Sequence, residues 1–96
     1  MRTLLEVDLD TETANRLITD GTLPQVVEGI LAALEPEAAY FHARDGRRAM
    51  TMVVDLADEA SIPAVCEPFW HQLNARVTAH PCMNADELRT GLGRLG

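Results

Sequence analysis

Four side chains of this sequence could exchange protons with a bound molecule. Glu6 and Asp8 stand near its beginning, His42 lies in the middle and His80 lies towards the end. Carboxyl and imidazole groups are those that proteins most often use as general acids and bases. We therefore regard these four residues as candidate catalytic residues. The same groups also form ion pairs where two protein surfaces meet, and the pattern favours that structural role over catalysis.

A second set of side chains could hold a ligand in place. The Arg76 guanidinium and the Tyr40 phenol can polarise a carbonyl or phenolate group, and the Thr51 hydroxyl can donate or accept a hydrogen bond. Trp70 lies away from the apolar stripe of its predicted helix. A half-buried indole at such a position packs at a boundary, contacts a neighbouring subunit or stacks on a ligand. We include these four residues as candidate ligand-binding residues.

The three histidines do not predict a metal site. His42 and His80 fall on strands expected at opposite edges of a sheet, about 14 Å apart at three strand spacings. Metal ligands lie only about 2 Å from the ion. His71 is expected on the outside of its helix. Only a site shared between two subunits, or one that combines Glu6 with His80, would escape this argument, so we expect neither a metal nor a cofactor.

The first part of the chain predicts a strand followed by an interrupted helix. A strand over residues 3–9 alternates apolar side chains with Glu6 and Asp8, which therefore share one face. Helical spacing then predicts a helix that Asp10 or Thr11 caps and that breaks at Asp20–Gly21. A second helical segment begins at Thr22, has a proline in its first turn and ends at Pro36.

Asp45 and Gly46 predict a tight hairpin between the next two strands. A type I′ turn needs positive φ at both central residues, and an Asp-Gly pair tolerates that conformation. The turn sets a register in which Tyr40, His42 and Thr51 share one face. The predicted partners are Arg44 with Arg47, His42 with Ala49, Phe41 with Met50, Tyr40 with Thr51, and Ala39 with Met52.

The last part of the chain predicts a helix, a strand and a short terminal helix. The helix begins near Ser61, and Pro68 should kink or break it near Glu67 because proline lacks the N–H of a helical hydrogen bond. The strand runs from residue 75 to about 79 and places Arg76, Thr78 and His80 on one face. Asn84 and Glu87 have the spacing of a capping box, so we expect a short helix through residue 88 and then a tail.

The predicted order βαββαβ describes a single α+β domain over residues 1–96. Right-handed connections give a ferredoxin-like, four-stranded antiparallel sheet of order 4-1-3-2 with its helices on one face. The helices should cover the face that carries Leu5, Val7, Phe41, Met52 and Val77. The opposite face is too apolar for a fully hydrated surface and too polar for a core. It carries Leu4, Glu6, Asp8, Ala38, Tyr40, His42, Ala49, Thr51, Val53, Asp55, Arg76, Thr78 and His80.

Composition narrows the possible partners and surroundings. The 96 residues carry a net charge of −7, which disfavours binding to nucleic acid phosphates. No apolar run approaches the roughly 20 residues that cross a bilayer, so we expect no membrane association. Cys66 and Cys82 lack CxxC spacing, and the acidic first ten residues do not resemble a signal peptide. We therefore expect reduced thiols and a cytoplasmic location.

Six short segments of the sequence together carry a resemblance to a known family: 36–41, 45–48, 53–55, 67–69, 73–76 and 81–83. They resemble a family of small, uncharacterised bacterial proteins whose layout is similar to that of the dimeric α+β barrel superfamily. The resemblance implies a homodimer in which two ferredoxin-like subunits press sheet against sheet, with a cleft in each subunit. It implies no particular activity and no catalytic residue.

Three functions are compatible with these observations. The first is a binding module that holds a small, partly apolar organic molecule between sheet and helices. The second is a cofactor-independent acid/base enzyme of the isomerase, cyclase or monooxygenase type, acting on a small cyclic or aromatic metabolite. The third is an interaction domain whose only task is to dimerise. A closed cleft with a titratable pair would favour the enzyme, whereas a flat face filled by partner side chains would favour the third function.

Overall fold

Every second side chain of the first strand is buried. In the computed structural model, which describes residues 1–96, β1 (Arg2–Asp8) buries Thr3, Leu5 and Val7, and the residues between them stay half-exposed. Successive side chains of a strand point to opposite faces of the sheet. One face of β1 is therefore covered by the rest of the chain, and the other is not.

The four strands form one antiparallel sheet. β2 (Ala38–Arg44) and β3 (Arg47–Asp55) form the hairpin, and β4 (Arg76–Pro81) pairs with β1 at the other edge, which gives the order β2-β3-β1-β4. This is the predicted strand order, 4-1-3-2, listed from the opposite edge of the sheet. The predicted hairpin register is confirmed at every partner. Asp45 and Gly46 have φ values of 53° and 76°, as a turn of this kind requires.

The helices that precede β2 begin and end close to where the sequence predicted. α1 (Thr11–Thr19) is capped by the Asp10 carboxylate, which accepts a hydrogen bond from the Thr13 N–H. The chain then turns at Gly21, and α2 (Leu23–Leu34) begins with Pro24 in its first turn. The bond to the Thr13 hydroxyl and the bond to the Thr13 N–H hold the pKa of Asp10 below its usual value.

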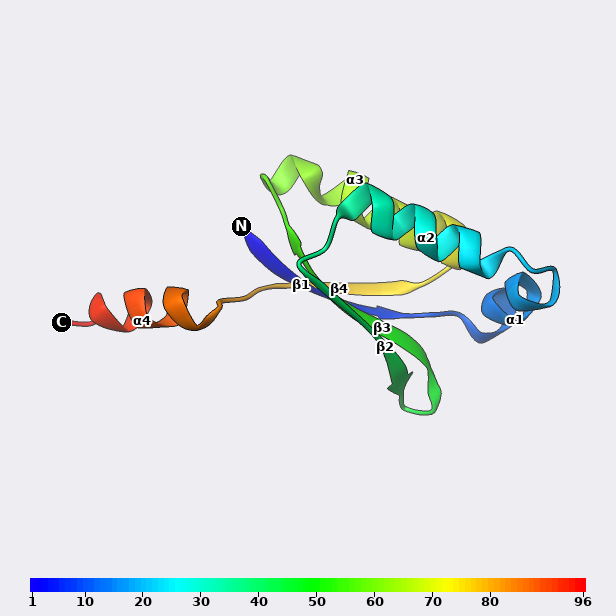
Figure 1. The fold of residues 1–96 in the computed structure, drawn as a ribbon, viewed down its shortest axis with the longest axis horizontal. Helices are drawn as coiled ribbons and strands as arrows, with labels where there is room; N and C mark the ends of the chain where they lie inside the picture. Colours follow the sequence, from blue (N-terminus) through cyan, green and yellow to red (C-terminus); the bar gives the residue numbers. More distant parts are fainter.

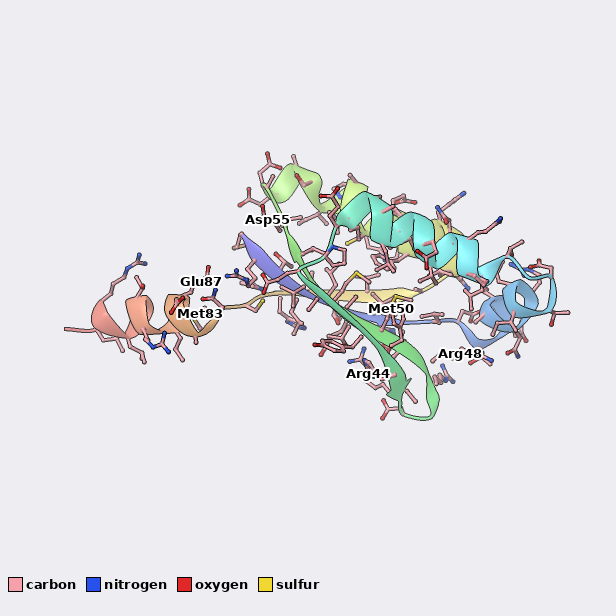
Figure 2. All side chains as sticks on the ribbon, viewed as in Figure 1. Arg44, Arg48, Met50, Asp55, Met83 and Glu87 are labelled. Atoms are coloured by element: carbon pink, nitrogen blue, oxygen red, sulfur yellow. The ribbon has the colours of Figure 1, made fainter.

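Two helices lie together on one side of the sheet, as Figure 1 shows. α3 (Ile62–Leu73) follows a short 3-10 helix, η1 (Glu59–Ser61), and packs beside α2. Between these helices and the sheet lies the core, in which Leu5, Val7, Met52, Phe69 and Leu73 are at most 1% exposed. Figure 2 places Met50 in the same layer. The α+β class and the four-stranded antiparallel sheet are therefore confirmed.

Phe41 departs from its predicted environment. We expected it under the helices with Leu5 and Met52, and its side chain points to that face, but it is 55% exposed. β2 is the outermost strand of the sheet. The two helices cover β1 and β3 and leave the edge strand with an uncovered aromatic side chain.

Of the predicted kink or break near Glu67, the break is wrong. α3 continues through Pro68 from Ile62 to Leu73. An interior proline costs a helix about 3 kcal/mol. Burial of Phe69 and of Leu73 each contributes about 1.5–3 kcal/mol, so packing on the sheet outweighs the loss.

The end of the chain is more ordered than predicted. β4 continues to Pro81, and the terminal helix α4 (Ala85–Gly93) continues beyond the predicted end at Leu88. Its capping box forms as predicted, because Asn84 and Glu87 exchange hydrogen bonds between side chain and backbone. In Figure 1, α4 extends away from the rest of the molecule.

No single helix is long and apolar enough to cross a membrane. α1 and α2 reach that length and composition only together, and they are bent by 110° at their junction.

Both cysteines are free. Cys66 is buried in the core, and burial raises the pKa of its thiol.

We predict that Phe69→Ala will lower the free energy of unfolding by about 3–5 kcal/mol, because it removes a fully buried aromatic ring. Trp70→Ala is the matched control, since Trp70 is the next residue of α3 and is 43% exposed. The measurement is urea denaturation followed by circular dichroism. Equal losses in the two variants would contradict the assignment of the core.

Candidate functional site

The face of the sheet that no helix covers mixes apolar, neutral polar and charged side chains. We call it the open face. Its three cross-strand rows follow from the register of the strands. The row that lies towards α4 consists of Ala38, Val53 and Leu4, which we call the apolar row, and of His80. The middle row contains Tyr40, Thr51, Glu6 and Thr78. The row towards the hairpin turn contains His42, Ala49, Asp8 and Arg76.

An arginine from the edge strand crosses the open face to the acidic residues of β1. Arg44 Nε and Nη2 lie 2.9 Å and 2.8 Å from Asp8 Oδ1, and Arg44 Nη1 lies 3.4 Å from Glu6 Oε2. The hydrogen bond to Asp8 and the charges of both carboxylates raise the pKa of the Arg44 guanidinium. The carboxylates that we selected as catalytic candidates are thus partners of a single guanidinium.

His80 approaches the same cluster from the other side of β1. Its Nε2 lies 3.8 Å from Glu6 Oε2. The Glu6 side chain is 34% exposed and that of His80 is 56% exposed, so water still reaches both groups. The structure therefore brings Glu6, Asp8 and His80 together with Arg44, and this group of four residues is the charged cluster of the open face.

His42 does not join the charged cluster. Its Nε2 lies 2.7 Å from the Thr51 hydroxyl oxygen, and both residues belong to the hairpin. Tyr40 stands opposite Thr51 in β2 and is 69% exposed. His42 and His80 occupy strands at opposite edges of the sheet. No group of three or more His, Cys, Asp or Glu side chains is arranged to hold a metal ion.

Arg76 lines a polar cleft at the hairpin end of the open face. The cleft has a volume of about 360 Å³ and no hydrophobic residue in its wall. Arg47 and Arg76 take part in no ion pair, in contrast to Arg44. Two guanidinium groups are thus free to bind an acidic group. The lining residues are Asp8, Asp10, Arg44, Asp45, Arg47, Asn74 and Arg76.

Trp70 lies apart from all the other candidates. It is on the exposed side of α3, a helix that packs on the covered face of the sheet. A ligand on the open face could not contact it within one copy of the chain.

Sequence reasoning missed Arg44, although a signal for it exists. Arg44 has the same parity as Tyr40 and His42 in β2, so the confirmed register already places its side chain on the open face. A guanidinium on a long flexible side chain can reach past one strand to carboxylates on the next. The predicted pairing of the strands was right. What the sequence did not show is that the Arg44 side chain extends across β3 to the carboxylates of β1.

Comparisons with known proteins add little to this description. No family model and no curated protein sequence matches the chain. Among solved structures, it is similar to the de novo designed protein Ferredog-Diesel, with a TM-score of 0.47 and 8% sequence identity over 84% of this chain and 85% of that one. The resemblance to a family that the sequence suggested therefore stays a prediction.

We predict that Arg44→Gln will lower the urea denaturation midpoint at low salt, because Asp8 and Glu6 lose their shared cation. Arg48→Gln is the control for net charge, since Arg48 forms no ion pair. The difference between the two variants should shrink in 1 M NaCl, where the screening length is about 3 Å. A difference that is absent at low salt would contradict the importance of this cluster.

Proposed function

We propose that this protein is a homodimeric binding module with a ferredoxin-like subunit. Two copies pack open face against open face as a dimeric α+β barrel. A small, partly apolar organic molecule binds between them. The observation that carries this proposal is the open face itself, which combines an apolar row, a charged cluster and a polar cleft.

The apolar row supports association through this face. Leu4 and Val53 are only half-buried, and Tyr40 beside them is largely exposed. Removal of such surface from water is favourable by about 25 cal/mol per Å². The helices that could cover these residues lie on the other side of the sheet. A second copy offers the same surface, which is the requirement for a two-fold interface.

The charged cluster fits the interior of such a dimer. A buried charge is tolerated when it is paired and hydrogen-bonded, and Arg44 already pairs with Asp8 and Glu6. Association would therefore enclose these side chains as an ion-pair network, and the guanidinium of Arg76, which has no carboxylate partner within one copy, would pair with the bound ligand.

The ligand belongs at the open face, whereas the sequence suggested a cleft between sheet and helices. The helix side is filled, since Val7 and Phe69 have no exposed surface. On the open face, Arg47 and Arg76 can bind an acidic group in the polar cleft. Leu4 and Val53 can contact an apolar part. This division fits a small organic acid with an apolar body.

A second candidate function is cofactor-independent acid/base catalysis. The approach of His80 Nε2 to Glu6 Oε2 favours it, because a carboxylate can orient an imidazole for proton transfer. In this function His80 moves the proton, while Arg44 and Arg76 stabilise negative charge on a carbonyl or phenolate oxygen.

We predict that the wild-type protein sediments as a dimer at micromolar concentration and that Val53→Asp sediments as a monomer. An aspartate in the apolar row would place an unpaired charge in the interface. Ile62→Asp is the control, because Ile62 is an exposed apolar residue of the helix layer. A monomeric wild type, or a Val53→Asp variant that remains dimeric, would refute the proposal.

We also predict that native mass spectrometry of freshly purified protein will detect a retained small molecule. Arg76→Gln should lose it, since one of the two free guanidinium groups is removed. Arg94→Gln, at the C-cap of α4 and away from the cleft, should retain it. Loss from both variants would place the site elsewhere, and a dimer that retains nothing would favour a pure interaction domain.

A further inference from the structure

The terminal helix α4 has almost no contact with the domain that carries it. None of its residues is buried. Its main link to the domain is the ion pair between Glu87 and Arg2. Figure 2 shows Met83 and Glu87 where the chain leaves the domain, far from Met50 in the core. Tertiary packing within one copy therefore does not explain why this segment is helical.

One side of α4 is an apolar stripe without a partner. Leu88 and Leu92 are four residues apart and therefore on one side of the helix, and they are 45% and 56% exposed. Leu95 continues the stripe just beyond the end of the helix. Asp86 and Arg89 pair with each other on the polar side. This amphipathic pattern is typical of a helix that packs on another surface.

The helix is too short to be stable without such a surface. α4 has nine residues, whereas isolated helices shorter than about 12–15 residues are marginal in water. Gly91 and Gly93 within it each cost about 1 kcal/mol relative to alanine. The capping box offsets part of this cost at one end only. A packing partner for Leu88 and Leu92 would supply the remaining stability.

The area of the proposed dimer interface points to the second copy as that partner. Four strands about 4.8 Å apart and seven residues at about 3.3 Å give the open face a footprint of about 400 Å². Two such faces bury about 800 Å², whereas stable, specific interfaces bury about 1,200–2,000 Å². Two docked copies of α4, each about 13 Å by 10 Å, add about 500 Å² and bring the interface into that range.

In the proposed dimer we place the two-fold axis parallel to the strands, and this choice sets which part of the second copy α4 can reach. α4 follows β4, which lies at the opposite edge of the sheet from β2. A two-fold axis parallel to the strands exchanges these edges, so β4 of one copy lies over β2 of the other. The exposed aromatic residues at that edge are Tyr40, on the open face, and Phe41, on the helix side of β2. An uncovered edge strand is also a surface that proteins commonly cover with a helix.

We propose that α4 is an exchanged arm: it crosses the β2 edge of a second copy and docks with Leu88 and Leu92 against Phe41, on the helix side of that strand. This inference rests on the proposed dimerisation through the open face. It adds that the interface is incomplete unless each copy lends its terminal helix to the other.

The first test is the dimer dissociation constant by sedimentation velocity. Leu92→Asp and Phe41→Ser should each raise it about tenfold or more, which corresponds to the loss of one buried side chain. Thr90→Asp, on the polar side of α4, and Ile18→Ser, on α1, should leave it within about twofold. These variants alter exposed residues, so circular dichroism should show an unchanged fold.

The second test is a crosslink between two different chains. In a background of Cys66→Ala and Cys82→Ser, a chain with Leu92→Cys is mixed with a chain with Phe41→Cys and oxidised. A disulfide-linked heterodimer is expected, because docked side chains bring the two positions within bonding range. A mixture of Leu92→Cys with Ile62→Cys chains should not crosslink.

The outcomes separate this inference from the proposed function. A dimer that Val53→Asp disrupts but Leu92→Asp does not would refute the exchanged arm and leave the proposed dimer intact. A monomeric wild type would refute both. A dimer sensitive to Leu92→Asp but not to Phe41→Ser, without the crosslink, would refute docking on β2.

Discussion

Burial of one side of β1 and β3 under α2 and α3 is the interaction on which the other features depend. Only 16 of the 96 residues are buried, and the largest of them belong to this single layer. α2 and α3 lie on the same side of the sheet, and no other helix covers the opposite side. The features of the open face follow from this one-sided cover: its half-exposed aliphatic row, its charged cluster and its uncovered edge strand.

Ion pairs, and not apolar packing, connect the charged side chains of the open face. Arg44 gathers Asp8 and Glu6 from the central strand, and His80 approaches from the other edge. Exposed ion pairs contribute little to stability in water. Exclusion of water would strengthen the attraction between these charges and would also add the cost of removing them from water. Both proposed roles of these four side chains, ligand binding and acid/base catalysis, depend on how far water is excluded from them.

Local signals in the sequence predicted the fold well, and long-range packing accounts for the errors. The Asp45–Gly46 turn determined the hairpin register, and Asn84 determined where the terminal helix begins. Pro68 was misjudged because its local cost is visible in the sequence, whereas the compensating burial of α3 depends on the assembled sheet. Arg44 was overlooked for a similar reason. Its partners are more than thirty positions away, and strand parity gives a side chain's face but not its reach.

The path of the Arg44 side chain has a steric consequence for β3. Ala49 points to the open face, opposite Asp8 on one side and His42 on the other, yet only 4% of it is exposed. The guanidinium runs from the edge strand to Asp8 past this position. A branched or aromatic substituent there would lift the arginine away from its carboxylates without disturbing the helix side at all. The ion pair between Arg44 and Asp8 thus requires a small side chain at position 49, so constraints on side-chain size in this protein extend to the open face.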